Sequence, residues 1–181
     1  MRRARVPTQW LFTDERLGGH KPDDPLWSAV RRLPRGGGIV FRHYRWPQPE
    51  RLALLAKLEG LARRRHLILI GSEIANASGG RHLPGHARRR HRPAIGLLTA
   101  AVHSQRDLLQ AFRSGADLVF LSPVFSTESH PGAAPIGSVR FGLSARGVPG
   151  PVMALGGMTG ARARRLAPLG AAGFAGIDCW R

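Results

Sequence analysis

Two glycines near the end of the chain have the setting of an anion-binding turn. Gly156 and Gly157 follow the apolar run 152–155 and precede Thr159, which can cap a helix over 161–169. Glycine lets a ligand approach the backbone closely, and the first N–H groups of the following helix point at the same place. These residues therefore suit a phosphate group. The alternative is a tight turn that needs only the conformational freedom of glycine.

Polar side chains follow other short apolar runs as well. Arg42 and His43 stand at the end of one run, Glu73 follows the next, and His103 comes later in the chain. An arginine can hold a phosphate or diphosphate, a histidine can carry a proton near neutral pH, and a carboxylate can bind a metal ion. For each histidine, a structural role is the alternative.

The longest connection in the chain is the segment 122–137. It offers hydroxyl groups and an imidazole at Ser126, Thr127, Ser129 and His130, and Gly132 and Gly137 could act as hinges. Long loops on a rigid scaffold often carry function. A disordered surface loop is the alternative.

These residues need a scaffold, and the apolar pattern provides one. Eight short runs read as buried strands, at 10–13, 39–42, 67–70, 80–83, 94–98, 118–121, 152–155 and 173–177. Helix patterns lie between them, at 24–33, 50–65, 105–113 and 161–169. The second of these helices presents Leu52, Leu55, Leu58 and Ala62 on one face, with arginines on the other side.

Repeated alternation of strand and helix predicts an α/β fold, a compact (β/α)₈ TIM barrel made of one domain over residues 1–181. The chain is short for such a barrel, so the connections 74–79 and 86–92 leave room for two helical turns at most. An open doubly wound sheet is the alternative, but no G-x-G-x-x-G follows the first strand. In a barrel, the residues that follow the strands meet at one face.

The charge balance is strongly basic. The chain has 28 Lys and Arg against 11 Asp and Glu, a formal net charge of +17, and only two lysines, Lys21 and Lys57. Such a charge suits nucleic acid or anionic metabolites. The near absence of lysine and of interleaved aromatics favours solvated arginine faces, including the segment 81–93, so we expect no nucleic-acid partner.

The sequence also predicts the cellular compartment. Cys179 is the only cysteine, so the chain can form neither an internal disulfide nor a cysteine zinc site, and we read this cysteine as a packing residue. The first residues lack the apolar core of a signal peptide, and no run is long enough to span a membrane. We therefore expect a cytoplasmic protein without membrane contact.

Six segments together resemble the thiamine phosphate synthase and thiazole tautomerase superfamily. They are LFTD (11–14), IVFRHY (39–44), AAVHS (100–104), GADLVFLSPVFST (115–127), VMALGGM (152–158) and GAAGFAGI (170–177). They occur in the family's order and cover most of the chain. The resemblance implies a barrel enzyme of thiamine biosynthesis that joins hydroxymethylpyrimidine diphosphate to thiazole phosphate, with magnesium and release of pyrophosphate.

The resemblance also implies roles for particular residues. Arg42 matches the arginine that holds the diphosphate, and Thr127 with His130 would close over the leaving group. His43 and His103 complete the candidate catalytic set. The substrate phosphate would be bound by Gly156, Gly157, Gly137 and Ile177.

Several family positions are substituted in this chain. At the positions of the family's magnesium-binding carboxylates, this chain supplies only one carboxylate, Glu73, so Mg²⁺ is a doubtful cofactor. Asp178 replaces a serine beside the phosphate, and Pro123 replaces the histidine that carries the proton in the tautomerases. The alternatives are a tautomerase-like enzyme, an altered barrel that only binds a phosphorylated metabolite, and an RNA-binding protein. The sequence says nothing about the oligomeric state.

Overall fold

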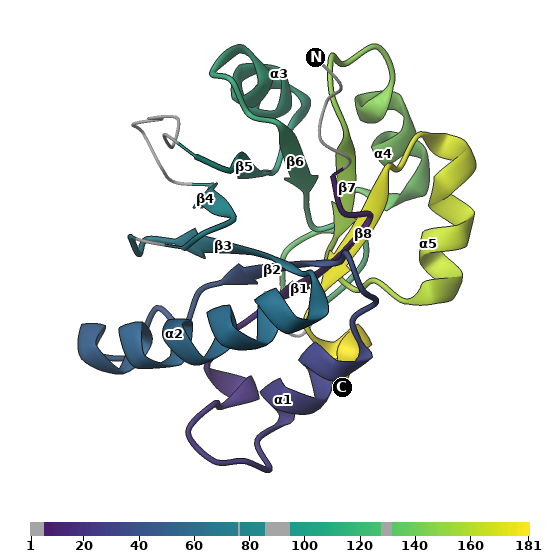
Figure 1. Ribbon diagram of the computed structural model, residues 1–181. Coiled ribbons are helices and arrows are strands. Elements are labelled where there is room, and N and C mark those ends of the chain that lie inside the picture. Colours follow the sequence, from purple (N-terminus) through teal and green to yellow (C-terminus); the bar gives the residue numbers. More distant parts are fainter. Residues whose placement is uncertain (1–5, 76, 86–94, 128–131) are drawn as a thin grey trace.

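Eight parallel strands close into a barrel in the computed structural model, which describes residues 6–75, 77–85, 95–127 and 132–181 (Figure 1). In chain order the strands are β1 (Gln9–Phe12), β2 (Gly38–Phe41), β3 (Ile68–Ser72), β4 (Gly80–Leu83), β5 (Leu97–Val102), β6 (Leu118–Leu121), β7 (Val152–Leu155) and β8 (Gly173–Gly176). Each strand pairs with its sequence neighbours, and β8 returns to β1 with Trp10 opposite Ala175. The (β/α)₈ prediction is confirmed.

Helices cover the outside of the barrel. They are α1 (Pro25–Arg32), α2 (Gln48–Arg65), α3 (Gln105–Arg113), α4 (Gly137–Ala145) and α5 (Gly160–Leu166), with 3₁₀ turns η1 (Glu15–Leu17), η2 (Ala167–Leu169) and η3 (Asp178–Trp180). The predicted cap is present, since the Thr159 hydroxyl accepts a hydrogen bond from the backbone N–H of Arg162, and Ser104 caps α3 in the same way by accepting from the backbone N–H of Asp107. No helix in the described part of the chain is both long and apolar enough to cross a bilayer.

The fifth strand begins later than its predicted range. It covers Leu97–Val102 instead of 94–98, so Thr99 lies inside a strand and not after one. Its hydroxyl is 2.8 Å from Nδ1 of the buried His82 on β4. Between β3 and β4, the described residues form turns and no helix, while the predicted connection 86–92 lies outside the described residues.

Helix α2 buries a different face from the predicted one. Leu55, Leu58 and Ala62 are buried as expected, but Leu52 is 41% exposed and Arg51 is only 6% exposed. Arg51 is buried because its guanidinium donates to three backbone carbonyl groups at the ends of β2 and β3. Hydrophobic spacing could not show this, because the acceptors belong to other elements.

Aromatic rings fill the barrel. Phe120 lies edge-on to Trp10 and Phe12, with ring centroids 5.4 and 4.8 Å apart, and His82 packs beside Phe12. A Cβ atom on Gly38 would collide with the Trp10 ring, so this glycine makes room for the tryptophan.

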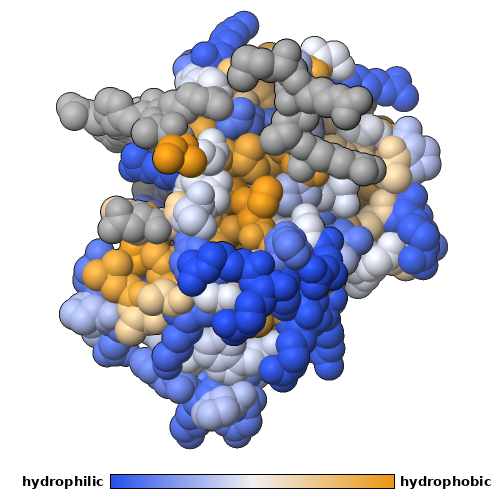
Figure 2. Space-filling view, in the orientation of Figure 1, coloured by the Kyte–Doolittle hydropathy of each residue, from blue (hydrophilic) through white to orange (hydrophobic). Residues whose placement is uncertain are grey.

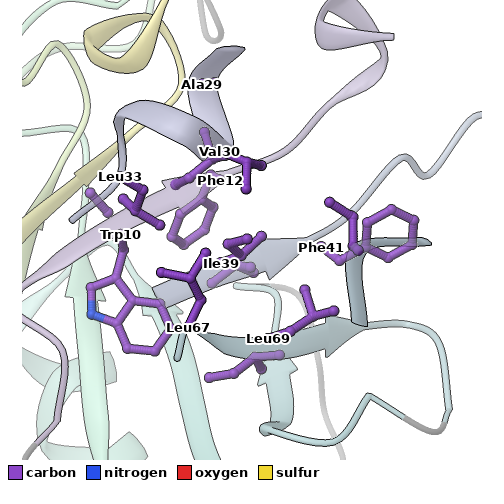
Figure 3. Packing of buried hydrophobic residues seen from close by; sticks show 14 of the residues in the cluster. Trp10, Phe12, Ala29, Val30, Leu33, Ile39, Phe41, Leu67 and Leu69 are labelled. Atoms are coloured by element: carbon purple, nitrogen blue, oxygen red, sulfur yellow. The ribbon is translucent and has the colours of Figure 1, made fainter. Parts of the chain in front are cut away.

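Outside the barrel, α1 packs on the strands. Figure 3 shows Ala29 and Val30 of this helix, and Leu33 directly after it, near the side chains of β1, β2 and the start of β3, within one buried cluster. The buried Trp180 lies beside α1: its Nε1 donates to the Trp10 carbonyl at 3.0 Å, and Arg32 donates to the Trp180 carbonyl. Trp180 therefore covers this side of the barrel.

Candidate active site

A cavity of about 370 Å³ opens where the strands end. Its lining residues come from β1, from the segments that follow β2, β5, β6, β7 and β8, and from α5. Six residues expected from the sequence lie together in its wall: Arg42, His103, Thr127, Gly156, Gly157 and Ile177. The volume suits a small organic ligand. Much of the remaining wall is apolar, with Phe12, Pro123, Leu155 and Met158.

The glycine turn lies in this wall. Gly156 and Gly157 have φ angles of 93° and 60°, which favour glycine. A Cβ atom on Gly156 would lie 2.8 Å from Cα of Pro123, and one on Gly157 would collide with the Ser126 carbonyl oxygen. Within the described residues, the N–H groups of both glycines donate to no protein acceptor. They are therefore available to an anion in the cavity.

The segment after β6 is held against this turn. The Val124 N–H donates to the Leu155 carbonyl at 2.9 Å, and the Phe125 N–H donates to the Gly156 carbonyl at 3.1 Å. These bonds place Ser126 and Thr127 in the cavity wall. His130 and Ser129 lie outside the described residues.

Gly137 lies in a different position from the other expected phosphate ligands. It begins α4, its N–H donates to the Val124 carbonyl at 3.0 Å, and it is not among the residues that line the cavity. The donor that we expected to bind a phosphate is used by the protein itself, so we leave Gly137 out of the proposed site.

Arg42 is held in place by Phe12, the last residue of β1, and by Thr13, which follows it. Its N–H donates to the Thr13 hydroxyl at 3.0 Å, its Nε donates to the Thr13 carbonyl at 2.9 Å, and its guanidinium lies over the Phe12 ring at 5.1 Å. Nη2 is 4.0 Å from Oδ2 of Asp14. Burial lowers the pKa of the guanidinium, but arginine keeps its charge at neutral pH. Arg42 thus gives the cavity a fixed cation.

Both ring nitrogens of His43 form hydrogen bonds within the protein. The Gly18 carbonyl can only accept, so Nε2 of His43 donates to it at 2.9 Å, which leaves Nδ1 to accept from the Thr13 hydroxyl at 3.0 Å. The ring is buried, and burial lowers its pKa. Both nitrogens are engaged away from the cavity lining, so we leave His43 out of the proposed site.

His103 has a defined tautomer. Its Nδ1 is 2.8 Å from the Ser122 carbonyl oxygen, so Nδ1 carries a proton and donates. In the neutral ring Nε2 then holds a lone pair. His103 lines the cavity, with Nε2 beside Gly85. This nitrogen can accept a hydrogen bond from a ligand.

Glu73 lies apart from the cavity. It lines a second hollow together with Gln48, Ile74 and Arg81, and it is not among the residues that line the main cavity. Among the described residues that line the main cavity, the carboxylate is Asp178, whose Oδ1 is 3.6 Å from Arg16 Nη1 and 3.4 Å from Arg181 Nη1. No group of three or more His, Cys, Asp or Glu side chains that could hold a metal occurs in the described ranges.

Two other residues of the cavity wall carry groups that could react with or bind a ligand, Cys179 and Arg162. Cys179 lines the cavity, but burial raises the pKa of its thiol to about 12, so it is not a thiolate nucleophile at neutral pH. Arg162 also lines the cavity, and the sequence analysis did not single it out. Its place three residues after the Thr159 cap was the available signal, because residues three apart on a helix share a face.

Comparison with known proteins identifies the family. The thiamine monophosphate synthase family matches residues 13–179 of the chain. A relative from Aquifex aeolicus is 32% identical over 184 residues, which cover 96% of this chain and 97% of the relative. The chain belongs to the thiamine monophosphate synthase family. The resemblance found in the sequence is confirmed.

Further relatives agree with this assignment to the thiamine monophosphate synthase family. A thiamine-phosphate synthase from Roseiflexus castenholzii is 31% identical and covers 93% of this chain and 78% of its own. Among solved structures, a thiamine phosphate pyrophosphorylase from Pyrococcus furiosus matches with a TM-score of 0.79 and 24% identity, over 96% of this chain and 86% of that one. The structural match shows that the barrel is shared.

Proposed function

We propose that this chain is a thiamine-phosphate synthase that joins hydroxymethylpyrimidine diphosphate to thiazole phosphate in the cytoplasm. The observation that supports this most is the presence of two anion-binding features in one cavity. Arg42 lies on one strand end, and the unengaged N–H groups of Gly156 and Gly157 lie on another. A reaction between a diphosphate and a monophosphate needs two such places.

The bond changes define what the cavity must do. The carbon–oxygen bond to the diphosphate breaks, and pyrophosphate leaves with the electron pair. The pyrimidine methylene cation that remains then forms a carbon–nitrogen bond with the thiazole nitrogen. Negative charge grows on the leaving oxygen, so a fixed cation at that point lowers the barrier.

Arg42 is the residue that we assign to the leaving diphosphate. Its guanidinium is held by one hydrogen bond from Nε to the Thr13 carbonyl and by the Phe12 ring, and its backbone N–H donates to the Thr13 hydroxyl, so little reorganisation is needed when charge develops. Thr127 lies in the same wall and can donate its hydroxyl to a phosphate oxygen. His130 would come from the same loop and remains a prediction from the sequence.

The apolar wall suits the ring systems of both substrates. Phe12, Leu155, Met158 and Ile177 offer contact area to a pyrimidine or a thiazole, and they limit access of water to the cation. The position occupied by histidine in the tautomerases is Pro123 here, which has no proton to transfer. A tautomerase reaction is therefore not favoured.

Magnesium does not fit the described residues of the cavity. Mg²⁺ prefers oxygen ligands and often binds one or two carboxylates together with substrate phosphates. The cavity carboxylate, Asp178, is already paired with Arg16 and Arg181, and Glu73 faces the other hollow. We assign no protein-held magnesium ion, and a metal ion carried in by the diphosphate would count as part of that substrate.

The test is pyrophosphate release from hydroxymethylpyrimidine diphosphate and thiazole phosphate. We expect turnover by the wild type and a loss of about 100-fold or more in kcat for Arg42→Ala, because a group that stabilises the leaving charge is removed. Arg42→Lys should keep part of the rate, since it keeps the charge but not the planar fork.

The matched control is Arg45→Ala, which removes an exposed arginine three residues away. It should leave the rate unchanged. Absence of turnover in a folded wild-type protein would refute the proposed activity, and equal losses in Arg42→Ala and Arg45→Ala would refute the role of Arg42.

A further inference from the structure

We infer that Arg162 binds the phosphate monoester held at the Gly156–Gly157 turn and sets the preference of the site for phosphorylated over unphosphorylated thiazole. This inference rests on the proposed function for the identity of the ligand. The observation that supports the inference is that Arg162 lines the same cavity as Gly156, Gly157 and Thr159.

Arg162 is fixed at the edge of the turn by two contacts. Its Nη1 donates to the Gly157 carbonyl, and its guanidinium lies over the Phe125 ring with 4.6 Å between Cζ and the ring centroid. Phe125 is itself joined to the turn, because its N–H donates to the Gly156 carbonyl. Arg162, Phe125 and the two glycines therefore form one connected unit.

The guanidinium has donors left for a ligand. It carries five N–H groups, and the hydrogen bond to the Gly157 carbonyl uses one nitrogen. Among the described residues, Arg162 has no carboxylate partner, in contrast to Arg16, which pairs with Asp14 and Asp178. A phosphate at the turn would supply the missing anion.

The chemistry of arginine explains why this contact would select a phosphate. The N–H groups of Gly156 and Gly157 can also serve a neutral acceptor, so they discriminate weakly between a phosphate and a hydroxyl group. A guanidinium beside a dianionic phosphate forms charge-assisted hydrogen bonds, which are about twice as strong as neutral ones. Arg162 thus adds discrimination that the turn itself lacks.

The experiment is calorimetric titration of the protein with thiazole phosphate and with the unphosphorylated thiazole alcohol, in the absence of the second substrate. We expect Arg162→Ala to raise the Kd for thiazole phosphate about tenfold and to leave the Kd for the alcohol within about twofold. Inorganic phosphate should compete with thiazole phosphate in the wild type and less so in the variant.

Two further variants test whether the effect depends on the charge of Arg162 and on its position in the cavity wall. Arg162→Gln keeps a donor for the Gly157 carbonyl but loses the charge, so it should resemble Arg162→Ala in phosphate affinity. Arg165→Ala removes an exposed arginine of the same helix that does not line the cavity, and it should bind both ligands as the wild type does.

The outcomes distinguish the inference from the synthase activity. Equal losses for thiazole phosphate and the alcohol, or equal effects of Arg162→Ala and Arg165→Ala, would overturn the role of Arg162. A wild type that binds thiazole phosphate through Arg162 without releasing pyrophosphate would leave the inference standing and remove the activity. Pyrophosphate release by the wild type, together with a Kd for thiazole phosphate that Arg162→Ala does not change, would leave the activity standing and overturn the inference.

Discussion

Asp178 introduces a negative charge into the wall of a cavity that we propose to hold anions. The residue follows β8, is 41% exposed at its side chain, and lies within 3.6 Å of Arg16 and 3.4 Å of Arg181. These two arginines offset its charge, so its repulsion of a phosphate is weakened but not removed. The serine that the family resemblance implies at this place would carry no such charge.

Replacement of Asp178 by Asn should strengthen phosphate binding. We expect the Kd for thiazole phosphate to fall about two- to fivefold at low ionic strength, because one partly screened repulsion disappears and two arginines are released. The gain should shrink as salt is added. Calorimetry across a salt series measures this change.

Asp23→Asn is the control for net charge, since Asp23 is exposed and does not line the cavity. It should leave the affinity nearly unchanged. An equal gain in both variants would show that only the net charge of the protein matters.

At the scale of elements, the ends of β2 and β3 are joined by a residue of α2. Arg51 donates to the carbonyl groups of Arg42, Ser72 and Glu73 at distances of 2.8 to 3.1 Å, and it is 6% exposed. The carbonyl groups at the strand ends have no further strand residues to bond, and Arg51 satisfies them. The same contact fixes the backbone of Arg42 beneath the cavity.

Removal of this contact should destabilise the barrel. We expect Arg51→Met to lower the free energy of unfolding by about 2–4 kcal/mol, because three buried carbonyl groups lose a charged donor. Urea unfolding followed by circular dichroism gives the value. Arg63→Met, at an exposed position of α2, should change stability by less than about 0.5 kcal/mol.

If both variants unfold at the same urea concentration, the contacts of Arg51 contribute nothing to stability. That result would contradict the assignment of Arg51 as the link between the helix and the strand ends.

For the whole molecule, the high positive charge is spread over many elements. Exposed arginines occur on α1, α2, α3, α4 and α5, and Figure 2 shows hydrophilic residues on several sides of the face in view. Nucleic-acid-binding proteins concentrate such residues in one patch or groove. The spread favours solvation of the outer helices, and our expectation of no nucleic-acid partner stays a prediction.

The stability of the barrel should depend on pH through His82. This residue lies inside the barrel, 2% exposed, with Nδ1 bonded to Thr99, and burial lowers its pKa to about 3, with Arg42 adding a smaller effect. The unfolded chain binds a proton near pH 6.5 that the folded protein does not bind. Stability therefore falls as the pH drops from about 6.5 toward 3, by up to about 1.4 kcal/mol per pH unit.

His82→Asn tests this dependence, because the amide can keep a hydrogen bond to Thr99 but does not titrate. Between pH 6.5 and 4.5 its free energy of unfolding should decrease less steeply than that of the wild type. His66→Asn, at an exposed helix end, should keep the wild-type slope. Parallel slopes for all three proteins would contradict the role of His82.

The barrel could be predicted from the sequence alone, because the pattern of apolar runs along the chain indicates eight buried strands. Eight apolar runs separated by helix patterns leave few arrangements that bury every strand on both faces, and the cap Thr159 begins its helix as predicted. The glycine pair was also readable, because two glycines at the end of a buried strand restrict the backbone to a turn. Local periodicity carries this information.

Only the tertiary structure decided which polar residues share the cavity. Arg42 and His43 are neighbours in sequence, yet one lines the cavity and the other is held by Thr13 and Gly18. Glu73 faces another hollow, and Arg162 enters the wall through Gly157 and Phe125. The physical reason is that a side chain after a strand turns toward whichever partner satisfies its polar atoms, and those partners come from segments distant in sequence.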